Sequence, residues 1–294
     1  MSGEMILFLG AFVGFLSGVF GVGGGFLTTP ILIFMGLPPS VVVGTQASQL
    51  VASSVSGVMA HFQKGNVDVR MGGVMLAGGF VGSFFGVMLF KLLQFLGQID
   101  LAIAVLYVLL LGTIGSMMFY ESLRAILRRK KGASEQSKSL ARSSSFLNSL
   151  PYKMRFHQSK LYMSALIPAG IGFFGGILVS VLGIGGGFIL VPAMIYILGM
   201  PTLLVAGTSL FQIIFTSAFA VTMHAVANHT VDMVLAVILI VGGVIGAQFG
   251  VRVSKYVKGA SARIILASII LAVAIKLAMT LLIIPDDLFS VGVS

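Results

Sequence analysis

Hydrophobic residues along this chain fall into long runs that are separated by short polar breaks. The longer runs reach the roughly 20 apolar residues that a helix needs to cross a bilayer. The pattern therefore predicts an all-α polytopic membrane protein with about 8–10 membrane segments. The runs form two sets of five, at about residues 5–20, 26–36, 41–60, 71–96 and 101–120, and then at about 161–182, 188–199, 203–227, 233–251 and 264–284.

The two sets contain the same residues in the same order, apart from shifts of one or two positions. A repeated series of this length indicates an internal duplication. We expect a first membrane repeat over residues 1–120, a linker over 121–160 and a second membrane repeat over 161–294. The matched pairs include Gly21/Gly183, Gly23/Gly185, Gly24/Gly186, Gly25/Gly187, Pro30/Pro192, Thr45/Thr208, Gln49/Gln212, His61/His224, Asp68/Asp232 and Lys91/Lys255.

Composition and charge exclude some classes of protein. Hydrophobic residues make up 57% of the 294 residues and charged residues only 9%, which excludes an ordinary soluble domain. The net charge of +10 does not indicate nucleic-acid binding, because ten of the 18 Lys and Arg lie between Arg124 and Lys160. Such a concentration is typical of a cytoplasmic loop under the positive-inside rule. We interpret this Ser-rich segment as a flexible linker or regulatory loop.

The same rule predicts how the repeats lie in the membrane. If the second repeat enters the membrane, breaks at residues 183–187 and returns, the loop with Arg252 and Lys255 falls on the cytoplasmic side and Asp286 falls outside. In the first repeat this logic places Lys64 inside and the amino terminus outside. Two inverted-topology repeats result, each with a glycine-broken first segment, and Lys91 is the exception. Re-entrant hairpins and pairs of crossings both fit.

The two glycine strings are the first candidate binding elements. Without side chains, their backbone N–H groups can approach a ligand closely, and a helix that starts just afterwards presents its positive dipole end. This combination favours an anion. Pro30 and Pro192 suit a first helical turn, for which Thr29 would be the N-cap in the first repeat. Tight helix packing is the alternative explanation for the glycines. The glycine candidates are Gly21, Gly23, Gly24, Gly25, Gly183, Gly185, Gly186 and Gly187.

A polar stripe on the next helix supplies the second candidate element. Thr45, Gln49 and Ser53 are four residues apart, as are Thr208, Gln212 and Thr216, so each trio shares one helix face. These neutral groups can hold a weakly hydrated oxyanion, or they can simply hydrogen-bond neighbouring helices.

Three further residues are candidates for gating or proton transfer. His61 and His224 end the polar helices and titrate near neutral pH. Lys276 is the one charge well inside an apolar run, and either attraction of an anion or snorkelling explains it.

Other chemistry finds little support in the sequence. Cysteine is absent, which removes thiolate catalysis and thiolate metal sites, and we expect neither a metal nor a cofactor. No Walker loop is present. An intramembrane hydrolase built on Ser17 or Ser180 with a histidine fits no strong nucleophile motif, so we do not expect an enzyme.

The duplicated GxGGGxxxxP string, with Gly-Thr and a glutamine on the next helix, resembles the TauE/SafE family of anion exporters and permeases. The resemblance implies a multi-pass plasma-membrane carrier for sulfite, sulfoacetate or other organosulfonates. We expect the anion to lie between the two glycine strings, beside Gln49 and Gln212, and to be exposed alternately to each side. An anion channel and a carrier of small carboxylates are the alternatives. The direction of transport, coupling to H+ or Na+, and assembly as a homodimer remain open.

Overall fold

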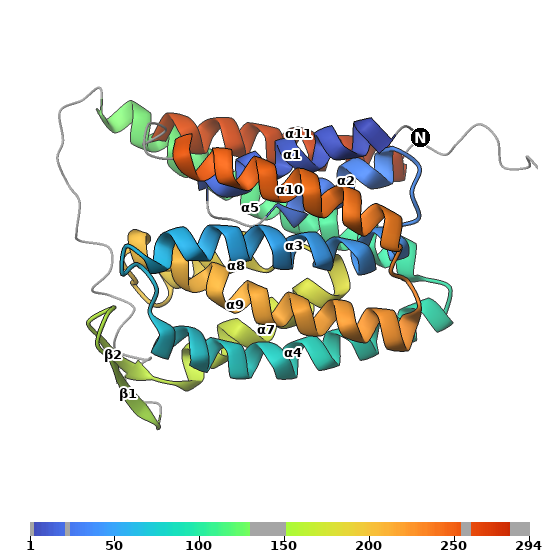
Figure 1. Ribbon diagram of the computed structural model, residues 1–294. Coiled ribbons are helices and arrows are strands. Elements are labelled where there is room, and N and C mark those ends of the chain that lie inside the picture. The colour runs from blue at the N-terminus through green and yellow to red at the C-terminus, as the bar shows by residue number, and fades with distance from the viewer. Residues whose placement is uncertain (1–2, 21–23, 130–150, 254–259, 283–294) are drawn as a thin grey trace, which may run out of the picture.

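The computed structural model describes residues 3–20, 24–129, 151–253 and 260–282. Figure 1 shows that helices dominate this part of the chain and that strands occur in a single hairpin. The predicted all-α polytopic fold is confirmed. The elements are α1 (Gly3–Phe20), α2 (Gly25–Phe34), α3 (Pro39–Phe62), α4 (Val69–Phe95), α5 (Ile99–Arg129), β1 (Lys153–Phe156), β2 (Leu161–Ser164), α7 (Leu166–Leu182), α8 (Gly187–Tyr196), α9 (Thr202–Met223), the π-helix η1 (His224–Asn228), α10 (Met233–Val253) and α11 (Ala260–Leu282).

Five of these helices are long and apolar enough to cross a membrane. These five are α4, α5, α9 together with η1, α10 and α11. Helix α3 has 24 residues, but its Thr, Gln and Ser side chains lower its hydropathy. Helices α2 and α8 have ten residues each, about 15 Å at 1.5 Å per residue. That is half the hydrocarbon thickness, so neither helix crosses the bilayer alone.

The helices of the first five and the last five pack against one another in matched pairs. Helix α1 contacts α10, and α7, which matches α1, contacts α4, which matches α10. The remaining main contacts join α3 with α9 and α5 with α11. Glycines make the first two contacts close, because a Cβ at Gly246 would overlap the carbonyl oxygen of Ala11 and one at Gly82 would overlap that of Phe173. Small residues allow this close backbone approach in membrane helices.

Matched helices run in opposite directions along the bundle. Figure 1 places the amino terminus and the α2–α3, α4–α5 and α9–α10 connections at one end, which we call the N-terminal end. The hairpin and the α3–α4 and α8–α9 connections lie at the other end, the hairpin end. The α1–α2 pair therefore starts and finishes at the N-terminal end, and α7–α8 starts and finishes at the hairpin end. The second glycine string is the turning point of the α7–α8 pair.

The range 121–160 differs at both ends from the expected flexible linker. Helix α5 continues to Arg129, and β1 pairs with β2 in antiparallel register, from Lys153 opposite Ser164 to Phe156 opposite Leu161. Phe156 is fully buried. Residues 130–150 lie outside the described part. The sequence did not predict the hairpin because its four-residue strands are too short to show a pattern.

The hairpin is attached to the start of α4. Asp68 caps that helix, where its Oδ1 accepts a hydrogen bond from the Met71 amide at 3.0 Å. The second carboxylate oxygen, Oδ2, accepts from both the amide and the hydroxyl of Ser159. The Arg70 guanidinium donates to the Arg155 carbonyl at 3.3 Å. These contacts fix the described end of the linker on the membrane bundle.

Candidate functional site

The second glycine string adopts the backbone conformation that only glycine accepts easily. Gly183, Gly185 and Gly186 have φ angles of +66°, +78° and +66°, in the left-handed region. Gly183 ends α7, and α8 begins at Gly187. Of the first string, Gly21 and Gly23 lie outside the described residues. Gly24 is the N-cap of α2 with a φ of −72°, so it does not need a glycine backbone.

The turn between α7 and α8 leaves backbone donors without acceptors. Residues 183–187 are all buried. The Gly183 amide donates to the Val179 carbonyl, and the Gly187 amide to that of Gly185. The amides of Ile184, Gly185 and Gly186 donate to no acceptor in the described part of the chain. Buried N–H groups are nearly always paired in proteins, so three in succession indicate a place for a ligand or water.

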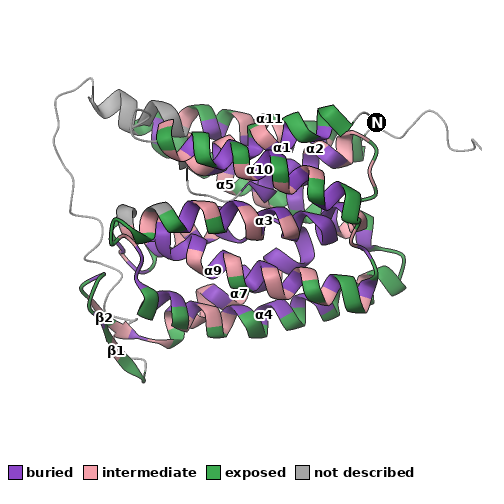
Figure 2. Ribbon diagram, in the orientation of Figure 1, coloured by how far each residue is buried: buried purple, intermediate pink, exposed green. Residues whose placement is uncertain are grey.

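The described end of the first glycine string contacts the second string inside the bundle. A Cβ on Gly25 would overlap the Gly183 carbonyl oxygen and would lie 3.0 Å from the Ile184 Cα. Just beyond them, the rings of Phe26 and Phe188 stack at 4.9 Å between centroids, with an angle of 11° between their planes. Figure 2 shows that buried residues dominate the inner helix faces. The start of α2 at Gly25 and the second glycine string therefore form one joint between the halves.

The prediction that the two prolines lie in a first helical turn is wrong. Pro30 and Pro192 each occupy the sixth position of their helix instead of the first turn, and the N-caps are Gly24 and Gly186, not Thr29. At the sixth position the ring removes the N–H that would bond to the carbonyl four residues earlier. The helix starts earlier than the proline indicates because the glycines themselves form the turn.

The threonines of the polar stripe bind the opposite half of the protein. The Thr45 hydroxyl accepts a hydrogen bond from the Asp232 amide at 2.9 Å, and the Thr208 hydroxyl accepts one from the Asp68 amide at 3.0 Å. Each aspartate in turn caps the helix that follows it. These reciprocal bonds explain why both threonines are present without any ligand.

The glutamines lie deeper and are both buried. The Gln49 Nε2 points to the Gly10 carbonyl at 3.5 Å, and it approaches Gly243 so closely that a Cβ there would lie 2.7 Å away. Gln212 lies against Gly79 in the matching way, at 3.1 Å. The Gln212 Oε1 is buried without a hydrogen-bond partner in the part of the chain that the structure describes.

Sequence reasoning missed Gln46, which is fully buried beside the joint. A Cβ on Gly183 would lie 3.5 Å from the Gln46 Cβ. Its Nε2 donates to the Gln49 Oε1 at 2.7 Å. The spacing of Gln46 and Gln49 could have indicated this pair, since residues three apart are neighbours on a helix face. The polar stripe was defined only by residues four apart, so it did not include Gln46.

The two histidines have different surroundings. His61 is partly exposed and lines a small cavity of about 10 Å³, close to the volume that one water molecule needs. Its Nδ1 is buried and has no hydrogen-bond partner among the described residues. The cavity runs between α1, α3, α9 and α10 near the hairpin end, and its lining residues are Ser17, Gly18, Ser53, Gly57, His61, Leu210, Ala247 and Val251.

His224 is fully buried and fully bonded near the N-terminal end. Its Nε2 lies 2.8 Å from the Ser180 carbonyl oxygen, and its Nδ1 lies 2.9 Å from the Asn228 Nδ2. The Phe90 ring packs edge-on against it at 4.6 Å. The Ser180 hydroxyl donates to the Ser83 carbonyl and not to the histidine. The geometry thus provides no serine–histidine nucleophile here.

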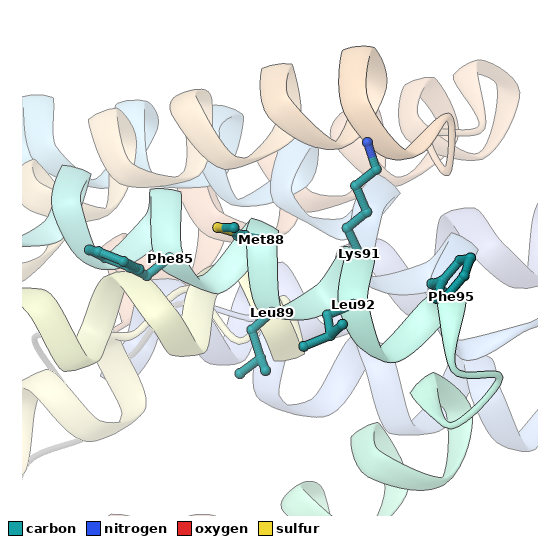
Figure 3. A pocket seen from close by; sticks show the side chains of 6 residues that line it. All are labelled: Phe85, Met88, Leu89, Lys91, Leu92 and Phe95. Atoms are coloured by element: carbon teal, nitrogen blue, oxygen red, sulfur yellow. The ribbon is translucent and has the colours of Figure 1, made fainter.

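Lys276 does not reach the buried polar residues. Its side chain is exposed on α11, and its Nζ lies 4.7 Å from the centre of the Phe34 ring. A larger hollow, of about 530 Å³, lies along the outside of α4. Figure 3 shows its six lining residues, Phe85, Met88, Leu89, Lys91, Leu92 and Phe95, all on that one helix. Such a groove between side chains of a single apolar helix is the surface that lipid chains cover.

Comparison with known proteins agrees with this architecture. The family model for the sulfite exporter TauE/SafE matches residues 6–277. This chain belongs to the TauE/SafE family. It is therefore a multi-pass membrane transporter, and its family is not a class of enzymes.

Curated relatives carry the same general description. A protein of Xylella fastidiosa (strain 9a5c), named "Probable membrane transporter protein", is 30% identical over 245 residues, covering 82% of this chain and 80% of the relative. The Bacillus subtilis (strain 168) proteins YjnA and YunE, both named as membrane transporters, are 27% and 25% identical. Their alignments cover 92% and 87% of this chain, and 98% and 89% of the relatives. No solved structure matches the chain.

Proposed function

We propose that this TauE/SafE family member carries small anions, most favourably sulfur oxyanions such as sulfite, sulfoacetate or another organosulfonate. The observation that carries the proposal is the series of three buried N–H groups, from Ile184 to Gly186, that have no acceptor among the described residues. A sulfonate offers three acceptor oxygens and one negative charge, and N–H groups at a helix start hold such a group without a full counter-charge. The family name supports sulfite as one substrate.

The mechanism we propose is alternating access between two inverted repeats. Its support is the reciprocal packing of α1 with α10 and of α7 with α4, together with the opposite directions of matched helices in Figure 1. The anion sits at the joint of the two glycine strings, as in transporters whose broken helices meet at a repeat interface. In this mechanism the anion reaches the joint from the hairpin end past the cavity at His61, and the bonded cluster at His224 closes the route from the N-terminal end.

We further propose that the hairpin end faces the cytoplasm and that the protein resides in the plasma membrane. Lys64 and Arg70 lie at or beside the α3–α4 connection, and Lys153, Arg155 and Lys160 belong to the hairpin region. All therefore lie at the hairpin end of the bundle in Figure 1. This distribution agrees with the positive-inside rule, and Lys91, near the N-terminal end of the bundle, is the exception.

Flux measurements in liposomes test the proposed function. Sulfite, sulfoacetate, taurine, sulfate, acetate and lactate are compared under imposed proton and sodium gradients. We expect saturable uptake of sulfur oxyanions and acceleration by the same anion on the opposite side, which a carrier shows and a channel does not. Unitary currents would identify a channel, preference for acetate or lactate would identify a carboxylate carrier, and preference for an uncharged solute would overturn the proposal.

A matched pair of glycine variants locates the site. Gly185→Ala forces an L side chain into a φ of +78° and against Leu50, which displaces the turn and its N–H groups. Gly97→Ala carries a similar strain at a φ of +69°, with nothing within 4 Å, far along the chain in the α4–α5 connection. We expect Gly185→Ala to lower the rate of transport by about tenfold or more and Gly97→Ala to leave it near that of the unmodified protein. Equal effects would remove the turn between α7 and α8 from the site.

A further inference from the structure

The amide of Gln46 lies at the joint of the two halves and is fully buried. It is next to Gly183 on one side and bonds to Gln49 on the other. The matching residue of the second repeat is Ser209, whose hydroxyl donates to the Ala206 carbonyl of its own helix at 3.0 Å. The first repeat alone therefore places an amide at this position.

The orientation of this amide is fixed by a chain of contacts. The Gln49 Nε2 faces the Gly10 carbonyl, so the Gln49 Oε1 faces Gln46. Turning the Gln46 amide alone would place two amide oxygens 2.7 Å apart. Turning both amides would place the Gln49 oxygen against the Gly10 carbonyl oxygen, with no hydrogen between them. Only the observed arrangement gives every close oxygen a donor.

One consequence is that Gln46, which is beside the joint, has a free acceptor. Its Oε1 is buried and has no hydrogen-bond partner in the described part of the chain. A buried carbonyl oxygen without a donor is costly, and such groups are rare in stable proteins. The Oε1 repels the oxygens of an anion, so the part of a ligand that contacts it must carry a hydrogen.

We propose that Gln46 selects anions that carry a hydrogen-bond donor near their charged group. This inference rests on the proposed function. The three N–H groups of residues 184–186 take the oxyanion, and the Gln46 Oε1 accepts a hydrogen bond from a hydroxyl, an ammonium or an acidic proton of the same molecule. The site thus distinguishes a hydroxylated or aminated sulfonate from a plain alkyl sulfonate of equal size.

Two anions of equal size test this selectivity in unmodified protein. They are 2-hydroxyethanesulfonate and propane-1-sulfonate, which differ by a hydroxyl in place of a methyl. We expect the hydroxylated anion to be transported with a KM about 3- to 10-fold lower, as one neutral hydrogen bond provides. Equal KM values would overturn the inference and leave the proposed function intact. Transport of neither anion, nor of any other sulfur oxyanion, would instead overturn the proposed function.

Variants then assign the preference to Gln46. Gln46→Met keeps the size and removes the acceptor, and Gln46→Ser copies Ser209 and is too short to reach. Both are expected to bring the KM ratio of the two anions close to one, while Ser209→Ala keeps the ratio of the unmodified protein. A ratio unchanged by both Gln46 variants would overturn the inference. The inference would also be overturned if the Gln46 variants changed the sodium dependence of transport equally for both anions, because Gln46 would then be a cation ligand.

Discussion

The regions around His61 and His224 occupy matching positions in the two repeats, yet one contains a cavity and the other is closed. The difference follows from the residues that surround each histidine. Four residues after His224 stands Asn228, which bonds to it, whereas four residues after His61 stands Gly65, which has no side chain. Phe90 packs on His224, and the matching residue Ser254 is small but lies outside the described residues.

Residue size explains the cavity as well. Gly18, Ser53, Gly57 and Ala247 line it, and the residues that match them in the opposite repeat, Ser180, Thr216, Ala220 and Ser83, are each larger. The added methyl and hydroxyl groups occupy, on the His224 side, the space that remains open beside His61. A duplicated fold can therefore close one route and leave the other partly open through a few small differences in side-chain volume.

The largest expected difference between the two regions is in stability. His224→Ala removes two hydrogen bonds and the contact with Phe90 inside a packed region, which should lower the free energy of unfolding by about 3 kcal/mol. His61→Ala removes a side chain that borders a cavity, and its effect should stay within about 1 kcal/mol. Unfolding of both purified variants in detergent measures the difference. Equal losses would mean that the two regions are packed alike.

Cysteine labelling measures access to the two routes. The chain has no native cysteine, so Ser53→Cys and Thr216→Cys introduce single thiols at matching positions. Both residues are buried, at 5% and 1% exposure, but only Ser53 lines the cavity. We expect a small thiol reagent to modify the cysteine at 53 about tenfold faster, because the one at 216 must wait for a local opening. Faster modification at 216 would contradict the proposed closed route at the N-terminal end.

The smallest expected effect concerns a feature that the repeats share. Thr45→Val and Thr208→Val keep the shape of the side chain and remove the acceptor of one backbone N–H in the opposite half. Each should cost about 1 kcal/mol of stability, with the two values close to each other. Thermal unfolding of both variants tests this. Loss of transport without loss of stability would instead support the threonines as ligands of the anion.

Much of the fold could be predicted from the sequence because long apolar runs indicate membrane helices. The second glycine string was correctly placed at a break, since three of its residues adopt left-handed backbone. The predicted helix starts at Pro30 and Pro192 were wrong. The preference of proline for a first helical turn is only statistical, and here the glycines before it already form the turn at which the helix begins. Gln46 was missed because the polar stripe was read at one spacing.

The sequence by itself determined the duplication, the apolar segments and the difference between Asn228 and Gly65, because each depends on residue type and order alone. Only the tertiary structure decided what the polar residues contact. Thr45 and Asp232 lie far apart in the chain, as do Gly25 and Gly183, and no local pattern specifies such pairs. The N–H groups of residues 184–186 and the Gln46 oxygen, which have no partner among the described residues, likewise follow from packing, because a polar atom lacks a partner only after every neighbour has been placed.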